Sequence, residues 1–505
     1  MSFLYRQSAQ LLQQVQSGKG SLKTLCFGGK GGDANESKGK RKVYALTSET
    51  LRYMPILEDI VRQAGLESTL MSNKAVNNKP LAYILLYELL LGKGSIQGGG
   101  KLKKLLISFK DRLEATLTRM REAKGIATGG ANELLLDPAH RRLIFPRYAR
   151  VNLLKTQVDE ALEQLRADGL DAKVDALIPT LLALPAGTEL HDHPMVVSGA
   201  LILQDKSSCF PAEALLESWQ GGDIIDACAA PGNKTSHLAS LLHQKPPANT
   251  GEHDSSPPKV FAFEKDLKRL EVLKRRCGEA GALHIIQPCL QDFLEADPGD
   301  KRFANVKGIL LDPSCSGSGI VNQPDRVIDR AGRSELSHDL GTRPSGSADD
   351  IRLGALADFQ VTALLKAFSF PGVARVTYST CSVHTAENEE VVAKALNRQV
   401  GCSVPYVAAL PISAQDEVLD GRGRYVLQKC IAQWHRRGMV VDGIDEQQAV
   451  CMGRALGSED NTNGFFVALL VRKMSKKKKK NKKKKKKAKK ASPLQEATEE
   501  LKEGE

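Results

Sequence analysis

The sequence contains no hydrophobic run near the roughly 20 residues that a transmembrane helix requires, so we expect no membrane partner. It also lacks the spaced Cys and His pairs that hold zinc, so we expect no metal. No apolar signal peptide opens the chain, and its ten cysteines over 505 residues do not form a disulfide framework. These absences favour a reducing compartment, either cytosolic or nuclear.

Most of the chain carries almost no net charge. The net charge is +13, but residues 472–505 hold sixteen Lys or Arg and five Glu, which leaves the rest almost neutral. Thirteen lysines fall within residues 476–490. Such a block repels itself, and we expect residues 474–505 to form a disordered tail that acts as an RNA-binding arm and a nuclear or nucleolar address. A solubilising tail without a specific partner is the alternative.

Residues 1–140 show leucines at helical spacing, which predicts an N-terminal helical domain. Gly-rich loops are expected at residues 28–39 and 92–100. A basic helix is expected over residues 101–121, with its Lys and Arg side chains facing either RNA or solvent.

Residues 141–205 predict a small α/β module. Strands are expected at residues 148–154, 172–178 and 201–204, and a helix at residues 158–165.

Residues 206–473 alternate strands with helices, which predicts a doubly wound sheet. Polar loops over residues 243–259 and 322–350 interrupt the pattern, and a hairpin at residues 450–472 ends it. The expected strands are residues 223–227, 260–263, 283–287, 308–311 and 376–380.

Cys315 and Cys381 follow the last two of these strands. Ligands bind at the carboxyl edge of such a sheet, so two thiols there indicate covalent chemistry on an electrophilic ring. Inert packing is the usual explanation for a single buried thiol. The paired placement favours function for these two, and the other eight cysteines keep the inert interpretation.

The first strand leads into a turn of small residues that opens a helix, where backbone N–H groups can approach a ligand closely. A P-loop is not favoured, because Asn233 stands where that motif requires Gly before Lys, and the dinucleotide pattern G-x-G-x-x-G is missing. Acids follow the next two strands. Glu264 is placed to accept hydrogen bonds from ribose hydroxyls, and Asp292 to meet an adenine amino group.

Three runs, D-A-C-A-A-P-G-N-K-T, D-P-S-C-S-G and Y-S-T-C-S, resemble the Sun/Fmu (Nop/Sun) family of RNA cytosine-5 methyltransferases over about residues 140–473. Within that family, the resemblance is to the fifth eukaryotic branch, which acts on large-subunit ribosomal RNA. The run Arg150–Lys155 resembles the R-x-N-T-L-K entry to the family's small RNA-recognition-like module, with Leu153 in place of Thr.

The resemblance implies a class I methyltransferase with a Rossmann-like sheet that uses S-adenosylmethionine to methylate cytosine C5. It implies Cys381 as the nucleophile that adds to cytosine C6, Cys315 in the release of the product, and Asp312 at the cytosine edge and the cofactor side of the pocket. It further implies a monomer in the nucleolus that binds ribosomal RNA and pre-ribosomal particles. The implied cofactor-binding residues are Cys228, Ala229, Ala230, Pro231, Gly232, Asn233, Lys234, Glu264, Arg269, Asp292 and Asp312.

Two departures from the family pattern concern the site. Ser314 precedes Cys315 where the family commonly has Pro, although the spacing from Asp312 is unchanged, and Glu264 replaces a more usual Asp. The missing Pro-Cys pair and the second thiol disfavour a DNA methyltransferase. A transfer-RNA cytosine-5 methyltransferase and a ribosome-assembly factor whose catalysis is dispensable remain as alternatives.

Overall fold

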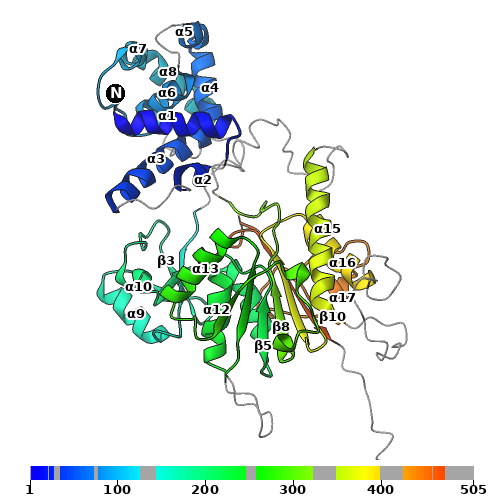
Figure 1. Cartoon of the computed structure of the whole chain (residues 1–505). Coiled ribbons are helices and arrows are strands. Elements are labelled where there is room, and N and C mark those ends of the chain that lie inside the picture. The colour runs from blue at the N-terminus through cyan, green and yellow to red at the C-terminus, as the bar shows by residue number, and fades with distance from the viewer. Residues whose placement is uncertain are drawn as a thin grey trace, which may run out of the picture.

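The computed structural model is a mixed α/β structure in which helices come first, then a small sheet, then a large one (Figure 1). The Lys-rich tail and most of the two predicted polar loops lie outside the described residues. Within the described part, no helix is both long and apolar enough to span a bilayer. The described residues are 2–20, 22–27, 34–72, 78–125, 144–245, 257–321, 348–398, 425–457 and 459–472.

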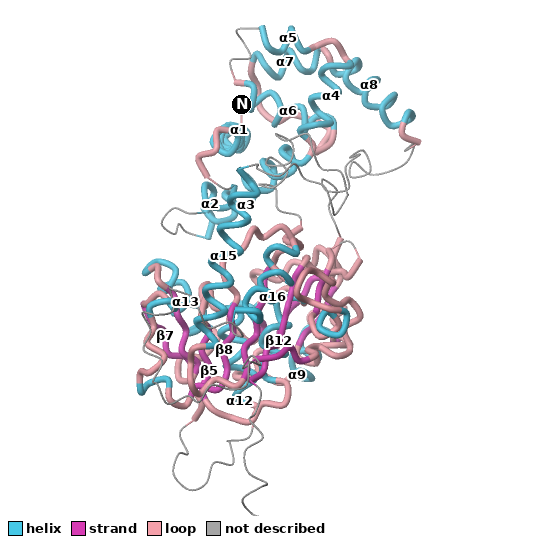
Figure 2. The backbone as a smooth tube through the Cα atoms, turned by 90° about the vertical axis from the view of Figure 1, so that its right-hand side faces the viewer, coloured by secondary structure: helices cyan, strands magenta, loops and turns pink. Residues whose placement is uncertain are grey.

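The N-terminal helices surround their own hydrophobic core, in which Leu12, Leu57 and Ile84 are fully buried. Arg41, on one of these helices, lies 3.3 Å from Asp192 of the small module, and Figures 1 and 2 show the helices as a group above the two sheets. They are α1 (Phe3–Gln16), α2 (Leu22–Phe27), α3 (Ala34–Arg52), α4 (Met54–Gln63), α5 (Glu67–Ser72), α6 (Lys79–Leu90), α7 (Lys101–Ser108) and α8 (Lys110–Ala123).

The predicted loop at residues 92–100 is confirmed, but two expectations for this region are wrong. Helix α3 begins at Ala34, inside the other predicted loop. The basic helix is two helices, because the chain bends at Phe109 between α7 and α8. The bend allows buried leucines of both helices, such as Leu106 and Leu113, to pack into the same core.

The small module is an antiparallel sheet in the order β2-β3-β1-β4. The predicted strand at residues 172–178 is reduced to two residues because Asp175 accepts the N–H groups of Leu177 and Ile178, which turns the chain. The apolar run after that turn forms β3, which was not predicted. The elements are β1 (Arg147–Val151), α9 (Val158–Ala167), β2 (Lys173–Val174), β3 (Leu181–Leu184), α10 (Pro194–Val197) and β4 (Leu201–Leu203).

The large sheet has the order β10-β12-β9-β8-β5-β6-β7, with β11 beside β12. Strands β9, β8, β5, β6 and β7 are parallel, and β12 runs antiparallel to β9. The strand order reverses between β5 and β8, where ligands bind in such sheets. The strands are β5 (Asp223–Asp226), β6 (Val260–Glu264), β7 (Ile286–Leu290), β8 (Val306–Leu311), β9 (Arg375–Thr380), β10 (Tyr425–Gln428), β11 (Gly453–Ala455) and β12 (Phe465–Arg472).

Helices cover both faces of the large sheet, as alternation along its strands requires. Ile224 of β5 packs with α11 (Phe210–Leu216), α12 (Asn233–His243) and α13 (Leu267–Glu279). Its neighbour Ile225 packs on the opposite face with α15 (Ala348–Phe368) and α16 (Glu389–Arg398). Short helices complete the chain: η4 (Ser207–Cys209), η5 (Phe293–Glu295), η6 (Lys301–Phe303), η7 (Thr385–Glu387) and α17 (Glu446–Ala449).

The doubly wound sheet and its closing hairpin are confirmed, with three differences in detail. The third strand starts at Ile286 instead of Leu283, because the turn that ends α13 leaves Leu283 exposed. Helix α15 begins at Ala348, within the predicted polar loop. Strand β10 was not predicted, and it pairs with the second half of β12, beyond the part that β11 covers.

Three side chains of the Arg150–Lys155 run attach the small sheet to the large one. Arg150 is fully buried and donates to Gln204 Oε1 at 2.9 Å and to Ser236 Oγ on α12 at 3.1 Å. Asn152 Nδ2 donates to the carbonyl groups of Gly199 and Ala280, both at 2.8 Å. Lys155 Nζ reaches the carbonyls of Ser198 and Glu279 at 2.6 Å. The run therefore contacts protein on both sides of the junction.

Replacing Asn152 with Ala should destabilise this junction by roughly 2–4 kcal/mol, because two buried carbonyl groups would lose their donor. The change is measured as a lower urea midpoint followed by tryptophan fluorescence. Both tryptophans of the chain, Trp219 and Trp434, pack in the cores of the large sheet and its surroundings. The matched control is Gln164→Ala, an exposed amide on α9, which should shift stability by less than about 0.5 kcal/mol. Equal effects of the two changes would contradict the assignment.

Candidate active site

The parallel strands β8 and β9 bring the two predicted thiols together. Leu311 and Tyr378 are partners in the ladder, so both chains leave the sheet at the same carboxyl edge. Four residues beyond Leu311 lies Cys315, and directly after β9 lies Cys381. Their Sγ atoms are 3.3 Å apart, within hydrogen-bond distance for sulfur, and both residues are partly exposed. The expectation that these two cysteines share a site is consistent with this geometry.

Asp312 lies beside the thiols and is held by two donors. Lys234 Nζ lies 2.7 Å from Asp312 Oδ2, and the Ser379 hydroxyl donates to Asp312 Oδ1 at 2.7 Å. The Lys234 ammonium also lies 5.5 Å from the centre of the Phe465 ring, a cation–π distance. Lys234 was predicted as a cofactor ligand, and its partner Asp312 was predicted on both the cytosine and the cofactor side of the pocket.

Neighbouring charges decide the protonation of these groups. Burial would lower the pKa of Lys234, but Asp312 and Cys381 outweigh it and hold that pKa above its ordinary value. The pKa of Cys315 is strongly raised, first by its hydrogen bond to Cys381, then by burial, and by the charges of Cys381, Asp312 and Glu387. At neutral pH, Lys234 is therefore a cation and Cys315 keeps its proton.

The predicted cofactor turn sits at the switch point of the sheet, between β5 and α12. Gly232 has φ +105° at the N-terminal cap of the helix, and a Cβ there would lie 3.3 Å from Cys277 Sγ. The turn is fixed by Thr235, whose hydroxyl donates to Asp226 Oδ2 at 2.7 Å. Burial raises the pKa of Asp226 to about 6. Such a cradle leaves helix N–H groups free for an anionic or polar ligand.

The other predicted cofactor residues lie on the neighbouring strands. Glu264 is buried at the end of β6, where its Oε1 accepts the N–H of Asp266 at 2.9 Å. Arg269 lies 3.3 Å from Glu264 Oε2 and donates to the Ala230 carbonyl at 3.1 Å, so it links the acid to the turn. Asp292, after β7, lies 3.2 Å from Lys265 Nζ and caps η5.

Several residues of this site were not predicted. Ser379 and Asp226 stand at strand ends and could have been found from that position. Glu387 was also not predicted. It is fully buried and accepts hydrogen bonds from Ser316, next to Cys315. No local pattern indicates that contact, since 71 residues separate the two partners.

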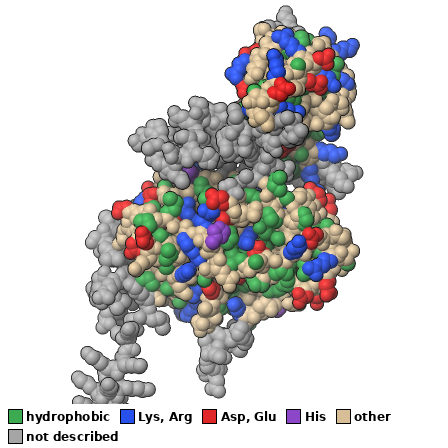
Figure 3. Space-filling view, turned by 180° about the vertical axis from the view of Figure 1, so that it is seen from behind, with side chains coloured by type: hydrophobic (Ala, Val, Ile, Leu, Met, Phe, Trp, Pro, Cys, Tyr) green, Lys and Arg blue, Asp and Glu red, His purple; other side chains and the backbone are tan. Residues whose placement is uncertain are grey.

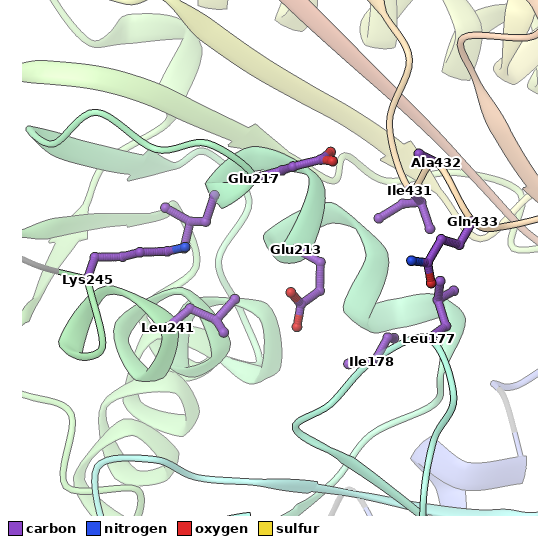
Figure 4. Close-up of a pocket in the computed structure, with 10 residues that line it drawn as sticks. Leu177, Ile178, Glu213, Glu217, Leu241, Lys245, Ile431, Ala432 and Gln433 are labelled. Atoms are coloured by element: carbon purple, nitrogen blue, oxygen red, sulfur yellow. The ribbon is translucent and has the colours of Figure 1, made fainter.

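A cavity of about 280 Å³ lies away from these groups, among α11, α12, the small sheet and the segment around Ile431. Glu213 points into it between Leu241 and Gln433 (Figure 4). Behind Glu213 lies the buried His237, whose Nε2 is 3.3 Å from Glu213 Oε1. The lining contains none of the predicted site residues. Across the described ranges, no group of three or more His, Cys, Asp or Glu is placed to hold a metal.

Two family models match the sequence. One, for the N-terminal domain of NOL1/NOP2/Sun domain family member 5, matches residues 41–131. The other, for the 16S rRNA methyltransferase RsmB/F, matches residues 213–337. The first covers the N-terminal helices from α3 to α8, and the second covers α11 to β8.

Whole-chain comparisons agree with these models. The chain is 36% identical to a 28S rRNA (cytosine-C(5))-methyltransferase of Mus musculus, over 93% of this chain and 91% of the mouse protein. It is 33% identical to the 25S rRNA (cytosine-C(5))-methyltransferase rcm1 of Schizosaccharomyces pombe, over 92% and 90%. The crystal structure of PH0851 matches 93% of this chain and 99% of that one, with TM-score 0.56 at 17% identity, which shows a shared fold.

The buried His237 should make the protein less stable in mild acid. Burial and the nearby Arg150 lower its pKa to about 4, against about 6.5 in an unfolded chain. Between these values the unfolded chain binds the proton and the folded one does not, so stability falls as pH falls through this window. From pH 7 to pH 5 this histidine should contribute a loss of about 2 kcal/mol.

The measurement is the urea midpoint of the protein at pH 7 and pH 5, compared with the His237→Gln variant. The variant should lose less stability over this interval. His284→Gln, which alters an exposed histidine, should keep the full loss. A parallel pH dependence in all three proteins would show that His237 is not responsible.

Proposed function

Since the chain belongs to the NOL1/NOP2/Sun family of RNA cytosine-C5 methyltransferases, we propose that it methylates C5 of a cytosine in large-subunit ribosomal RNA. The observation that carries this proposal is the pair of thiols 3.3 Å apart beside Asp312 and Lys234. The mouse and yeast relatives are named for large-subunit ribosomal RNA, which favours that substrate over transfer RNA.

Cytosine C5 is a weak nucleophile, and addition of a thiol to the ring can activate it. Attack of the Cys381 thiolate on C6 forms a C–S bond and moves electron density to C5, which can then accept a methyl group. Hydrogen bonding or protonation at N3 eases the attack. Asp312 and Lys234, paired at 2.7 Å beside the thiols, are placed to hold a proton at that edge of the base.

Cys315 suits the second half of the reaction. Its pKa is raised mainly by Cys381, and that cause disappears once Cys381 is bonded to C6 and carries no charge. Cys315 then loses its proton more readily and can act as the base that removes the C5 hydrogen. The electrons of that C–H bond restore the C5–C6 double bond and expel Cys381 as a thiolate.

S-adenosylmethionine would supply the methyl group. The residues present fit such a ligand, since Gly232 gives the turn its positive φ and begins α12, whose N-terminal N–H groups suit a polar or anionic group. Glu264 and Asp292 stand at the ends of adjacent strands, where a carboxylate can accept hydrogen bonds from ribose and adenine. Arg269 holds Glu264 in place.

The RNA would be held by several parts of the chain. The target base must leave its stack to reach the thiols. On the face seen in Figure 3, basic side chains lie among acidic ones instead of forming one continuous patch. The sequence itself has its densest run of positive charge at residues 476–490, where thirteen lysines suit phosphate contacts and a nucleolar location.

Replacing each of the two cysteines with alanine, one at a time, tests the proposed reaction. Cys381→Ala should abolish methylation and every covalent protein–RNA adduct, because no other group is proposed to attack C6. Cys315→Ala should still attack and transfer the methyl group but release the product slowly, so an adduct should accumulate. A denaturing gel with labelled RNA and S-adenosylmethionine measures both outcomes.

The double variant is the control, because its adduct should disappear if Cys381 forms the bond. Cys451→Ala, at a partly exposed cysteine outside the site, should behave like the unchanged protein. Normal methylation by Cys381→Ala, or an adduct that persists in the double variant, would show that the assigned roles are wrong.

Removing residues 475–505 should weaken RNA binding and flatten its dependence on salt, because fewer phosphates are neutralised and fewer counterions are released. Binding is measured from about 50 to 200 mM salt by fluorescence anisotropy. Methylation at saturating RNA should be retained, since every proposed catalytic group lies before the deletion. An unchanged salt slope would argue for the alternative of a tail that only improves solubility.

A further inference from the structure

We propose that Glu387 is a positioning residue for product release, which it serves by holding Cys315 in place. This inference rests on the proposed function. Glu387 is fully buried at the end of η7, and the reaction described above does not use it. A buried carboxylate needs compensating hydrogen bonds, so the partners that it selects indicate its task.

Both oxygens of Glu387 are directed at the loop that carries Cys315. Oε1 accepts the backbone N–H of Ser316 at 2.8 Å, and Oε2 accepts the Ser316 hydroxyl at 2.5 Å. Glu387 therefore binds both the main chain and the side chain of the residue that follows Cys315.

Gln360 of α15 holds the residue on the other side of Cys315, which is Ser314. Its Nε2 donates to the Ser314 carbonyl at 3.0 Å and to Glu387 Oε1 at 3.2 Å. Its Oε1 lies 3.1 Å from the buried Tyr378 hydroxyl, which donates to the Glu387 carbonyl at 2.5 Å. Ser314 and Ser316, on either side of Cys315, thus belong to one hydrogen-bond network, in which Glu387 bonds both Ser316 and Gln360.

The Cys381 side of the pair has supports of its own, besides the contact of Ser316 Oγ with Ser382 Oγ at 3.3 Å. Thr380 Oγ1 donates to Asn388 Oδ1 at 2.5 Å, and Asn388 Nδ2 donates to the Ser382 carbonyl at 3.0 Å. Gly319 N–H donates to the Cys381 carbonyl at 2.9 Å. None of these bonds uses the Glu387 carboxylate. Losing that carboxylate should therefore displace Cys315 while Cys381 keeps its position.

The two thiols act at different steps, so this displacement has a distinct kinetic signature. A general stability defect would lower adduct formation and turnover together. A misplaced Cys315 should instead leave attack by Cys381 nearly intact and slow the release. The expected result for Glu387→Ala is adduct formation within about twofold of normal, with turnover reduced about tenfold or more and the adduct accumulating.

Glu387→Gln should restore much of the function. A glutamine oxygen can still accept the Ser316 and Gln360 N–H groups. Its amide nitrogen can donate to the Ser316 hydroxyl, which can turn toward Ser382 Oγ at 3.3 Å. Turnover of this variant should lie within about threefold of normal, without visible adduct.

Glu389→Ala is the matched control. Glu389 is equally buried two residues later, but it pairs with Arg454 at 2.6 Å instead of holding the Cys315 loop. Its loss should lower the melting temperature and decrease adduct formation and turnover together. The four variants Glu387→Ala, Glu387→Gln, Glu389→Ala and Cys315→Ala are compared in one denaturing-gel series with labelled RNA and S-adenosylmethionine.

The outcomes separate this inference from the proposed function. If Cys315→Ala gives no adduct, the proposed function fails. If Cys315→Ala gives an adduct and Glu387→Ala does not, the proposed function stands and the role of Glu387 is refuted. Should Glu387→Ala not fold, Gln360→Met is tested instead, because it removes the hydrogen bond to the Ser314 carbonyl and keeps a side chain of similar volume. It should accumulate the same adduct, and its failure to do so would equally refute the inference.

Discussion

The parallel ladder between β8 and β9 is the constraint on which the site depends. It aligns Leu311 with Tyr378, so that two chain segments separated by 66 residues leave the sheet side by side. The thiols meet only because both strands end at that level. Each strand is buried on both faces, so a shift by one residue would exchange the core residues of the two faces. The register of the sheet is therefore also the alignment of the reactive groups.

Burial at this edge concentrates charge in a small volume. Lys234 is nearly enclosed, yet its pKa is raised, because Asp312 and Cys381 compensate for the lost hydration. The same surroundings raise the pKa of Cys315. Cys315 therefore keeps its proton, and the first cause is its hydrogen bond to Cys381. A thiol that stays protonated until its neighbour has reacted fits a base that acts in a later step than the nucleophile.

Sequence reasoning succeeded where a short segment carries its own signal. Strands β5, β6, β8 and β9 are apolar runs that end in distinctive residues, and Cys315 and Cys381 were found from those ends. It failed where a feature is formed by tertiary contact. Strand β3 follows a turn fixed by one Asp175 side chain, and β10 pairs with a strand about 40 residues later. Two contacts join segments that no local sequence pattern relates. They are the Lys234–Asp312 ion pair and the hydrogen bond from Ser316 to Glu387.

The direction of β12 has a consequence for the part of the chain that follows it. Phe466 lies opposite Thr380 and Val471 opposite Arg375, so the chain leaves the sheet at Arg472, on the edge away from the thiols. Six paired residues at about 3.4 Å each separate the two edges by roughly 20 Å. A chain extends by at most about 3.3–3.6 Å per residue, so at least about six residues beyond Arg472 are needed to return to the level of the thiols. Only lysines farther along the sequence than that have the length of chain needed to contact an RNA phosphate beside the reacting base.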